Sequence, residues 1–216
     1  MEMIEMLRGI YRADQMRTDE PMAAHTTMRV GGTVDHFVCP EEPDQLIQTL
    51  QLGIPCLVLG NGSNLIVRDG GLRGVAISTA GLNQIHVDGV HIRAQAGVTL
   101  PALAQEALRR KLSGLEFASG IPGSVGGAVC MNAGAYGGSI QDVIVGAWVL
   151  LDGETVYLPR EELHMGYRTS RVLKQKGIVL EAEFALTAGD PDAIKAMMDD
   201  LNGRRRDKQP LNLPSS

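Results

Sequence analysis

Long apolar runs, aromatic side chains and paired cysteines are all scarce in this sequence of 216 residues. The longest apolar run, residues 143–151, has nine residues, whereas a helix that crosses a membrane needs about 20. Met1 does not lead into an apolar core of the signal-peptide kind. We therefore expect a cytoplasmic protein with no membrane partner.

An excess of positive charge is also missing, because 20 basic and 25 acidic residues give a net charge of −5. Non-specific binding to nucleic acid depends on basic side chains that contact phosphates, so we expect no nucleic-acid partner. The cysteines form no close pair and are expected to be free thiols; they are Cys39, Cys56 and Cys130. The histidines form no metal-ligand pattern, so no metal site is predicted; they are His25, His36, His86, His91 and His164.

Glycine, by contrast, is abundant. It accounts for 26 of the 216 residues, about 12% against a usual ~7%. Apolar residues make up 44% and charged residues 21%, which is typical of a globular protein and excludes disorder or a fibrous repeat. Nine of these glycines lie in two segments, residues 60–64 and 120–138, which indicates backbone in close contact with another group.

Hydrophobic spacing predicts an α+β protein of two lobes with a boundary near residues 79–83. The expected lobes are residues 1–80 and 81–208, and residues 209–216 are expected to be extended. For the first lobe we expect a helix over 1–16, short strands within 26–40, a helix from Pro43 to Gly53, and strands at 56–59, 65–67 and 75–77.

The second lobe is predicted to contain two hairpins, at Asp88-Gly89 and at Asp152-Gly153. Thr99 is expected to cap a helix that ends at Gly114, and Asp190-Pro191 is expected to start the last helix. A further strand is predicted at 178–186. Residues 120–138 hold so many glycines that we expect neither an ordinary helix nor a strand there.

The first glycine segment, Gly60-Asn61-Gly62-Ser63-Asn64, follows a predicted buried strand. Its amides and polar side chains could form an anion cradle, or the glycines could simply close a hairpin. It matches neither the dinucleotide fingerprint nor the phosphate loop of nucleotide-binding proteins.

The second segment reads GIPGSVGGA at 120–128 and continues as NAGAYG at 132–137. So many small residues indicate a flat or bulky ligand lying against the main chain, although tight turns alone would be an alternative. Two such segments suggest a ligand with a diphosphate and a planar end, as in a dinucleotide flavin.

Five segments together make the sequence similar to the UDP-N-acetylenolpyruvoylglucosamine reductase family of peptidoglycan synthesis. They lie in the family's order, at residues 26–32, 60–64, 120–138, 166–170 and 205–211. The resemblance implies an FAD-binding fold of the p-cresol methylhydroxylase type, with the cofactor between two lobes. It also implies non-covalent FAD, NADPH as hydride donor, and UDP-N-acetylglucosamine enolpyruvate as the small-molecule substrate.

By this resemblance two sets of residues hold the cofactor. The set expected at the FAD diphosphate is Asn61, Gly62, Ser63, Asn64, Gly120, Ile121, Pro122, Gly123, Ser124, Gly126, Gly127 and Ala128. The set expected to line the flavin is Asn132, Ala133, Gly134, Ala135 and Tyr136.

The resemblance also assigns polar residues to the substrate. Arg168 matches the family's catalytic arginine, and Tyr167 and Lys208 match positions that bind substrate. A guanidinium can stabilise the negative charge that forms beside a carboxylate when an enolpyruvyl double bond is reduced. A surface arginine paired with a carboxylate would be the alternative. Arg204, Arg205 and Arg206 are expected to form a solvated helix end.

The sequence ends before the family's Gly-Ser-x-Phe-Lys segment, whose serine is the proton donor, and before the family's catalytic glutamate. By this resemblance we expect the flavin-binding part of the reductase, with residues 209–216 at the start of a missing substrate-binding domain and with doubtful activity of the 216 residues alone. The alternatives are an FAD-binding module without turnover and an α+β binding protein without flavin.

Overall fold

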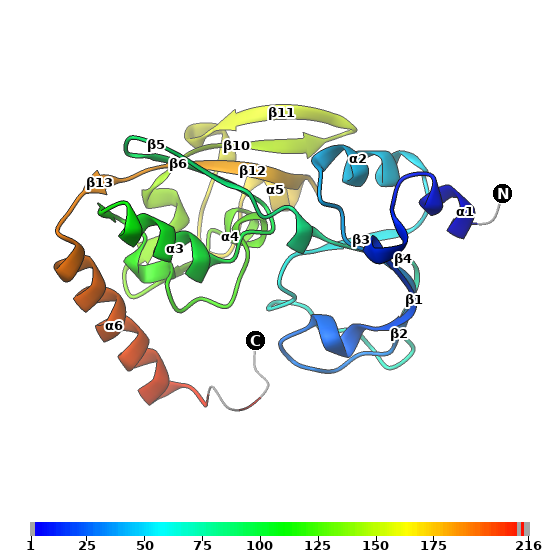
Figure 1. Cartoon of the computed structure of the whole chain (residues 1–216), viewed down its shortest axis with the longest axis horizontal. Coiled ribbons are helices and arrows are strands. Elements are labelled where there is room, and N and C mark those ends of the chain that lie inside the picture. Colours follow the sequence, from blue (N-terminus) through cyan, green and yellow to red (C-terminus); the bar gives the residue numbers. More distant parts are fainter. Residues whose placement is uncertain (1–2, 211–212, 214–216) are drawn as a thin grey trace. The chain divides into compact units, whose positions relative to one another are not determined.

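The computed structural model describes residues 3–210 and 213 (Figure 1). The chain divides into two compact units: the first ends at Leu82, and the second begins at Asn83 and extends to Leu213. Each unit has helices and a main sheet of its own, and each is described separately.

The first unit is built on a sheet of four strands in the order β1-β2-β4-β3. β1 pairs antiparallel with β2, and β4 pairs parallel with both β2 and β3. The elements are α1 (Met3–Arg8), β1 (Met16–Pro21), β2 (Thr33–Val38), α2 (Pro43–Gln51), β3 (Cys56–Leu59) and β4 (Leu72–Ser78). The core contains Met22, Val34, Phe37, Leu59, Val67 and Ala76.

Three expectations for this unit are wrong in part. The helix predicted over 1–16 ends at Arg8, and residues 26–40 contain one strand, β2. Residues 65–67 form no strand, because the parallel partner of β3 is β4. Strand β1 was missed because it lies at the sheet edge with most side chains in solvent. Backbone hydrogen bonds to β2 form this strand, so its side chains show no alternation of apolar and polar residues.

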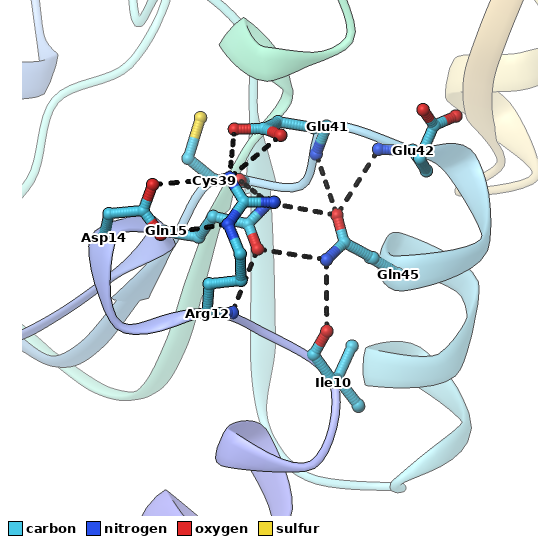
Figure 2. A network of polar contacts seen from close by, with 8 residues as sticks. All are labelled: Ile10, Arg12, Asp14, Gln15, Cys39, Glu41, Glu42 and Gln45. Carbon is cyan, nitrogen blue, oxygen red and sulfur yellow. Dashed lines mark hydrogen bonds and ion pairs between the residues drawn. The ribbon is translucent and has the colours of Figure 1, made fainter.

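A pair of glutamines joins the N-terminal segment to α2 (Figure 2). The amide groups of Gln15 and Gln45 donate to each other's oxygen atoms, at 3.2 and 3.1 Å. Gln45 Nε2 also donates to the carbonyl of Ile10, and its Oε1 accepts from the amide of Glu41. Gln15 Oε1 accepts from the amide of Arg12. The pair therefore satisfies backbone groups at both ends of the connection.

The second unit contains an antiparallel sheet of five strands in the order β11-β10-β12-β6-β5. Its strands are β5 (Ile85–Asp88), β6 (His91–Gln95), β10 (Ile144–Leu151), β11 (Glu154–Pro159) and β12 (Ile178–Ala185). Two small pairs are formed by β7 (Leu112–Ser113) with β13 (Thr187–Ala188) and by β8 (Gly134–Ala135) with β9 (Gly138–Ser139). The helices are α3 (Leu100–Arg109), α4 (Val125–Met131), α5 (Arg171–Lys174) and α6 (Pro191–Lys208).

The helices α3 and α4 lie on the same side of this sheet (Figure 1). Leu103 of α3 and Val129 of α4 belong to one buried core with Ala147 and Ala182 of the sheet. Both predicted hairpins are confirmed, as are the Thr99 cap of α3 and the start of α6 at Asp190-Pro191, where the Asp190 side chain also caps the helix. The helix after Thr99 ends at Arg109 rather than at Gly114, because Lys111 already has φ +59°.

The expectation of neither an ordinary helix nor a strand within 120–138 is wrong, because α4 and β8 lie there and β9 begins at Gly138. Tertiary contacts outweigh the poor helix propensity of its glycines. The amides of Val125 and Gly126 donate to the carbonyls of Val98 and Ala96, at 2.8 and 2.9 Å. Of the predicted extended tail over 209–216, residues 211–212 and 214–216 lie outside the described residues.

Candidate functional site

The first glycine segment, residues 60–64, follows β3 and packs against residues 25–27 of the same unit. Gly62 has φ +62°, and a Cβ there would lie 1.9 Å from the carbonyl oxygen of His25. The amide of Thr27 donates to the carbonyl of Gly62 at 3.2 Å. Gly62 is thus required by a close approach within the chain itself.

The polar side chains of this segment remain accessible. Asn61 and Asn64 are exposed, and Ser63 is half-buried. Beside them, the Thr27 hydroxyl is buried and has no hydrogen-bond partner among the described residues. A buried hydroxyl without a partner costs free energy, and an anionic ligand would satisfy it. This orphaned group fits the phosphate end of a nucleotide.

The second glycine segment forms the connection into α4 and the helix itself. Gly120, Ile121, Pro122 and Gly123 precede Ser124, which is the N-cap residue of α4. The first two helical amides are already bound to backbone carbonyls, so they are not free for a ligand. A Cβ on Gly126 would lie 3.0 Å from the Cβ of Ala96, and Ala128 is buried on the same helix.

Gly127 faces different surroundings from Gly126. It is exposed, and a Cβ there would meet only the Ser124 hydroxyl, at 3.7 Å. Ser124 is only 3% exposed, and its hydroxyl has no hydrogen-bond partner among the described residues. An open glycine surface beside an unsatisfied hydroxyl is the feature of α4 that best fits a bound phosphate group.

The residues expected to line the flavin form the end of α4 and the β8–β9 hairpin. Asn132 ends the helix in the left-handed conformation with φ +43°. Ala133 is buried, and Gly134 and Ala135 form β8. Tyr136 and Gly137 make the turn with φ values of +55° and +89°, and the Tyr136 side chain is exposed.

Several glycines within residues 120–138 are required by close packing of the chain. A Cβ on Gly120 would lie 2.3 Å from Asn202 of α6, and one on Gly134 would lie 2.6 Å from the carbonyl of Gly138. A Cβ on Gly138 would meet the ring of Phe117 at 2.8 Å. The density of glycine therefore reports close packing of the chain as well as room for a ligand.

Tyr167 and Arg168 occupy the centre of a tight turn. The amides of Gly166 and Thr169 each donate to the other residue's carbonyl, at 3.0 and 3.3 Å. Tyr167 is 95% exposed, and Arg168 is exposed with φ +54°. Two hydrogen bonds tie this turn to α4: Asn132 Nδ2 donates to the carbonyl of Gly166 at 3.2 Å, and the Ser170 hydroxyl donates to the carbonyl of Cys130 at 2.8 Å.

Lys208, the third residue expected at the substrate, lies exposed at the last position of α6. Arg205 and Arg206 share this last turn, where positive charge is favourable near the helix C-terminus. The side chain of Arg204 pairs with Asp200 one turn earlier, at 2.7 Å.

Sequence reasoning missed a polar cluster next to the first glycine segment. His25 Nε2 lies 2.8 Å from Glu20, which also accepts from Arg17 at 3.0 Å, and the His25 ring stacks on Phe37 at 4.0 Å. Partial burial raises the pKa of Glu20, but the hydrogen bonds from His25 and Arg17 outweigh it and lower the pKa overall. Nothing in the spacing of these residues indicated the cluster, because β1 was not expected.

Among residues 3–210 and 213, no group of three histidine, cysteine or acidic side chains is arranged to hold a metal ion. In that same part of the chain, none of the helices is long and apolar enough to cross a membrane. All three cysteines are free, and burial raises the pKa of Cys130 to about 11.

Comparison with known proteins shows which family the chain is similar to. Residues 34–158 match the family described as FAD binding domain. A UDP-N-acetylenolpyruvoylglucosamine reductase of Geobacillus kaustophilus is 52% identical over 202 residues, which are 91% of this chain and 66% of that protein. The reductase of Clostridium novyi is 46% identical over 215 residues, 97% of this chain and 70% of that protein.

Solved structures agree with this match. The crystal structure of the reductase from Thermus caldophilus has a TM-score of 0.79 and 35% identity, over 90% of this chain and 71% of that chain. An alkyldihydroxyacetonephosphate synthase, with a TM-score of 0.64 and 20% identity, covers 86% of this chain and 40% of its own and shows the fold alone. The expected α+β fold of the p-cresol methylhydroxylase type is confirmed.

The fold and the family match define an FAD-binding flavoprotein. Within that class, the chain belongs to the UDP-N-acetylenolpyruvoylglucosamine reductase family. It spans about two thirds of the length of the relatives that it matches, from 66% to 73%.

Proposed function

We propose that this chain is the flavin-binding part of an enzyme that reduces UDP-N-acetylglucosamine enolpyruvate to UDP-N-acetylmuramate with NADPH. The family membership supports the reaction. The main structural support is that the turn with Arg168 is hydrogen-bonded to the end of α4. The NADPH dependence, the substrate and a cytoplasmic location are parts of this proposal.

FAD is proposed to bind without a covalent bond. In this proposal the side chains of Asn61, Ser63 and Asn64 contact the diphosphate in the first unit. In the second unit Gly127 offers the open backbone, and the buried hydroxyl of Ser124 gains the partner that it lacks among the described residues. Bound FAD supplies hydride transfer, from NADPH to the enolpyruvyl carbon of the substrate.

Arg168 is proposed to stabilise the charge that develops in this reaction. Hydride addition at C3 places negative charge at C2, which is conjugated with the substrate carboxylate. A guanidinium held on a tight turn can donate two parallel hydrogen bonds to that carboxylate. Tyr167, which is 95% exposed at the same turn, is proposed to contact the substrate, and Lys208 to pair with its phosphates.

Replacing Arg168 separates the two halves of the reaction. Because Arg168 has φ +54°, Arg168→Asn removes the guanidinium while tolerating the left-handed backbone. In a protein that carries the complete substrate-binding region of the relatives, flavin reduction by NADPH should stay nearly unchanged. Reoxidation by the enolpyruvyl substrate should slow about 10²-fold or more.

Rapid mixing of each half-reaction, followed by flavin absorbance, checks this expectation. Arg160→Asn is the control, since Arg160 is also exposed in the second unit but has no proposed role. An unchanged reoxidation rate in Arg168→Asn would contradict the catalytic role. Product analysis for UDP-N-acetylmuramate distinguishes the reductase from a flavin module without turnover.

A further inference from the structure

The side chain of Asn132 has no remaining hydrogen-bond donor for a cofactor. Its Nδ2 donates to Gln141 Oε1 at 3.0 Å and to the carbonyl of Gly166 at 3.2 Å. Its Oδ1 accepts from the amide of Gln141 at 3.0 Å. An asparagine amide has two N–H donors, and both are used within the chain.

The orientation of this amide is set by its partners. The backbone N–H of Gln141 can only donate, so the side-chain oxygen of Asn132 must face it. The carbonyl of Gly166 can only accept, so the side-chain nitrogen of Asn132 must face that carbonyl. Asn132 is only 8% exposed, and its left-handed backbone ends α4. The backbone and the side chain are therefore both held, and the amide is aimed at the turn of residues 166–169.

A second hydrogen bond fixes the other end of that turn. Ser170 is fully buried, and its hydroxyl donates to the carbonyl of Cys130 at 2.8 Å. The same hydroxyl accepts from the amide of Leu173 at 3.2 Å and so caps α5. Cys130 lies in the final turn of α4, where backbone carbonyls lack partners within the helix, and Asn132 is the C-cap of that helix.

We propose that Asn132 and Ser170 are positioning residues that hold the Tyr167–Arg168 turn in a fixed place relative to α4. This inference rests on the proposed function, in which the turn carries the catalytic Arg168. It assigns Asn132 a role other than the flavin contact expected from its place in the sequence. The guanidinium is on a long, flexible side chain, so fixing its backbone at both flanks reduces the range that it can sample.

Two substitutions at Asn132 separate its side chain from its backbone. Asn132→Asp keeps the acceptor for Gln141 and the tolerance for positive φ, but it loses both donors. Asn132→Gly keeps the left-handed backbone and removes the whole side chain. Asn202→Asp is the matched control: Asn202 Nδ2 donates to Ser119 at 3.2 Å in the same unit, away from the turn.

Amide hydrogen exchange of the FAD-loaded chain measures the turn directly. In both Asn132 variants we expect the hydrogen-bonded amides of Gly166 and Thr169 to exchange about 10-fold faster. Exchange in strand β12 and the FAD affinity should stay within about threefold of the parent, and Asn202→Asp should leave the turn unchanged. Unchanged exchange at the turn in both Asn132 variants would overturn the proposal. So would a loss of FAD affinity without faster exchange, since it would make Asn132 a flavin contact.

Ser170→Ala provides a second route if either Asn132 variant unfolds, because it removes the bond to Cys130 from the opposite flank. The same local increase in exchange is expected, and its absence would overturn the role of Ser170. In the protein that carries the complete substrate-binding region, Asn132→Asp should slow only flavin reoxidation, about 10-fold to 10²-fold. It should add little to the defect of Arg168→Asn, because both changes act through the same guanidinium.

The outcomes of these experiments distinguish the anchoring of the turn from the catalytic role of Arg168. Faster exchange in the Asn132 variants, with no effect of Arg168→Asn on reoxidation, would leave the anchoring intact and refute the catalytic arginine. Slower reoxidation in Arg168→Asn, with no change of exchange or of rate in the Asn132 and Ser170 variants, would refute the anchoring alone.

Discussion

Two adjacent glycines of α4 have different neighbours, although the sequence places both in one repetitive segment. A Cβ on Gly126 would press on Ala96, whereas a Cβ on Gly127 would meet nothing closer than 3.7 Å. Gly126 therefore belongs to the packing of the second unit. Gly127 is the residue whose missing side chain leaves room for a ligand.

Valine at each position separates these roles. Gly127→Val should weaken FAD binding strongly while the protein remains folded, because its side chain projects into open space. Gly126→Val should instead lower the free energy of unfolding by about 1–3 kcal/mol through overpacking against Ala96. Flavin fluorescence titration and chemical unfolding of both variants test the assignment, with Gly127→Ala as the smaller change at the open site. Parent affinity in Gly127→Val would mean that α4 does not contact the cofactor there.

At the scale of elements, a reciprocal amide pair rather than a long helix holds the N-terminus of the first unit. Gln15 is 5% exposed, and its side chain bonds to the backbone of Arg12 and Cys39 as well as to Gln45 (Figure 2). Gln45 lies in the first turn of α2, and its Oε1 accepts a hydrogen bond from the backbone amide of Glu41. One side chain therefore both caps the helix and binds the segment before β1.

Removing the half-buried Gln45 should therefore lower the free energy of unfolding more than removing an exposed glutamine of α2. Gln45→Ala leaves the buried amide of Gln15 without its main partner, which should cost about 1–3 kcal/mol of unfolding free energy. Gln48→Ala is the control, because Gln48 is an exposed glutamine on the same helix. Urea unfolding of both variants provides the measurement, and equal stabilities would refute a structural role for the pair.

At the scale of the whole molecule, cofactor binding should appear as added stability. A ligand that binds only the folded state raises the free energy of unfolding, by about 2.7 kcal/mol at 100 times its dissociation constant. We expect FAD at that concentration to raise the melting temperature and its removal to reverse the change. Riboflavin, which has no phosphate groups, should have a much smaller effect because Thr27 and Ser124 gain no partner from it.

A thermal melt with and without each flavin checks this expectation. Acid precipitation of the FAD-loaded protein then tests the bond itself, since a non-covalent cofactor stays in the supernatant. Flavin in the pellet, or no thermal shift even in excess FAD, would contradict the proposed mode of binding.

Local chemistry decided what could be predicted from the sequence. Both hairpins carry turn residues suited to positive φ, and Thr99 and Asp190 supply oxygens that cap helices within three residues of themselves. The five family segments indicated the FAD-binding fold, which the comparisons confirm. The predicted lobe boundaries and individual site residues remain predictions.

Only the tertiary structure decided the features that depend on distant partners. Strand β1 exists because β2 pairs with it, and α4 forms because Val98 and Ala96 accept its first amides. The link from Asn132 to Gly166 joins residues 34 positions apart. Such contacts leave no periodic signal, since the energy that selects them comes from packing and hydrogen bonds between segments rather than from the preferences of either segment alone.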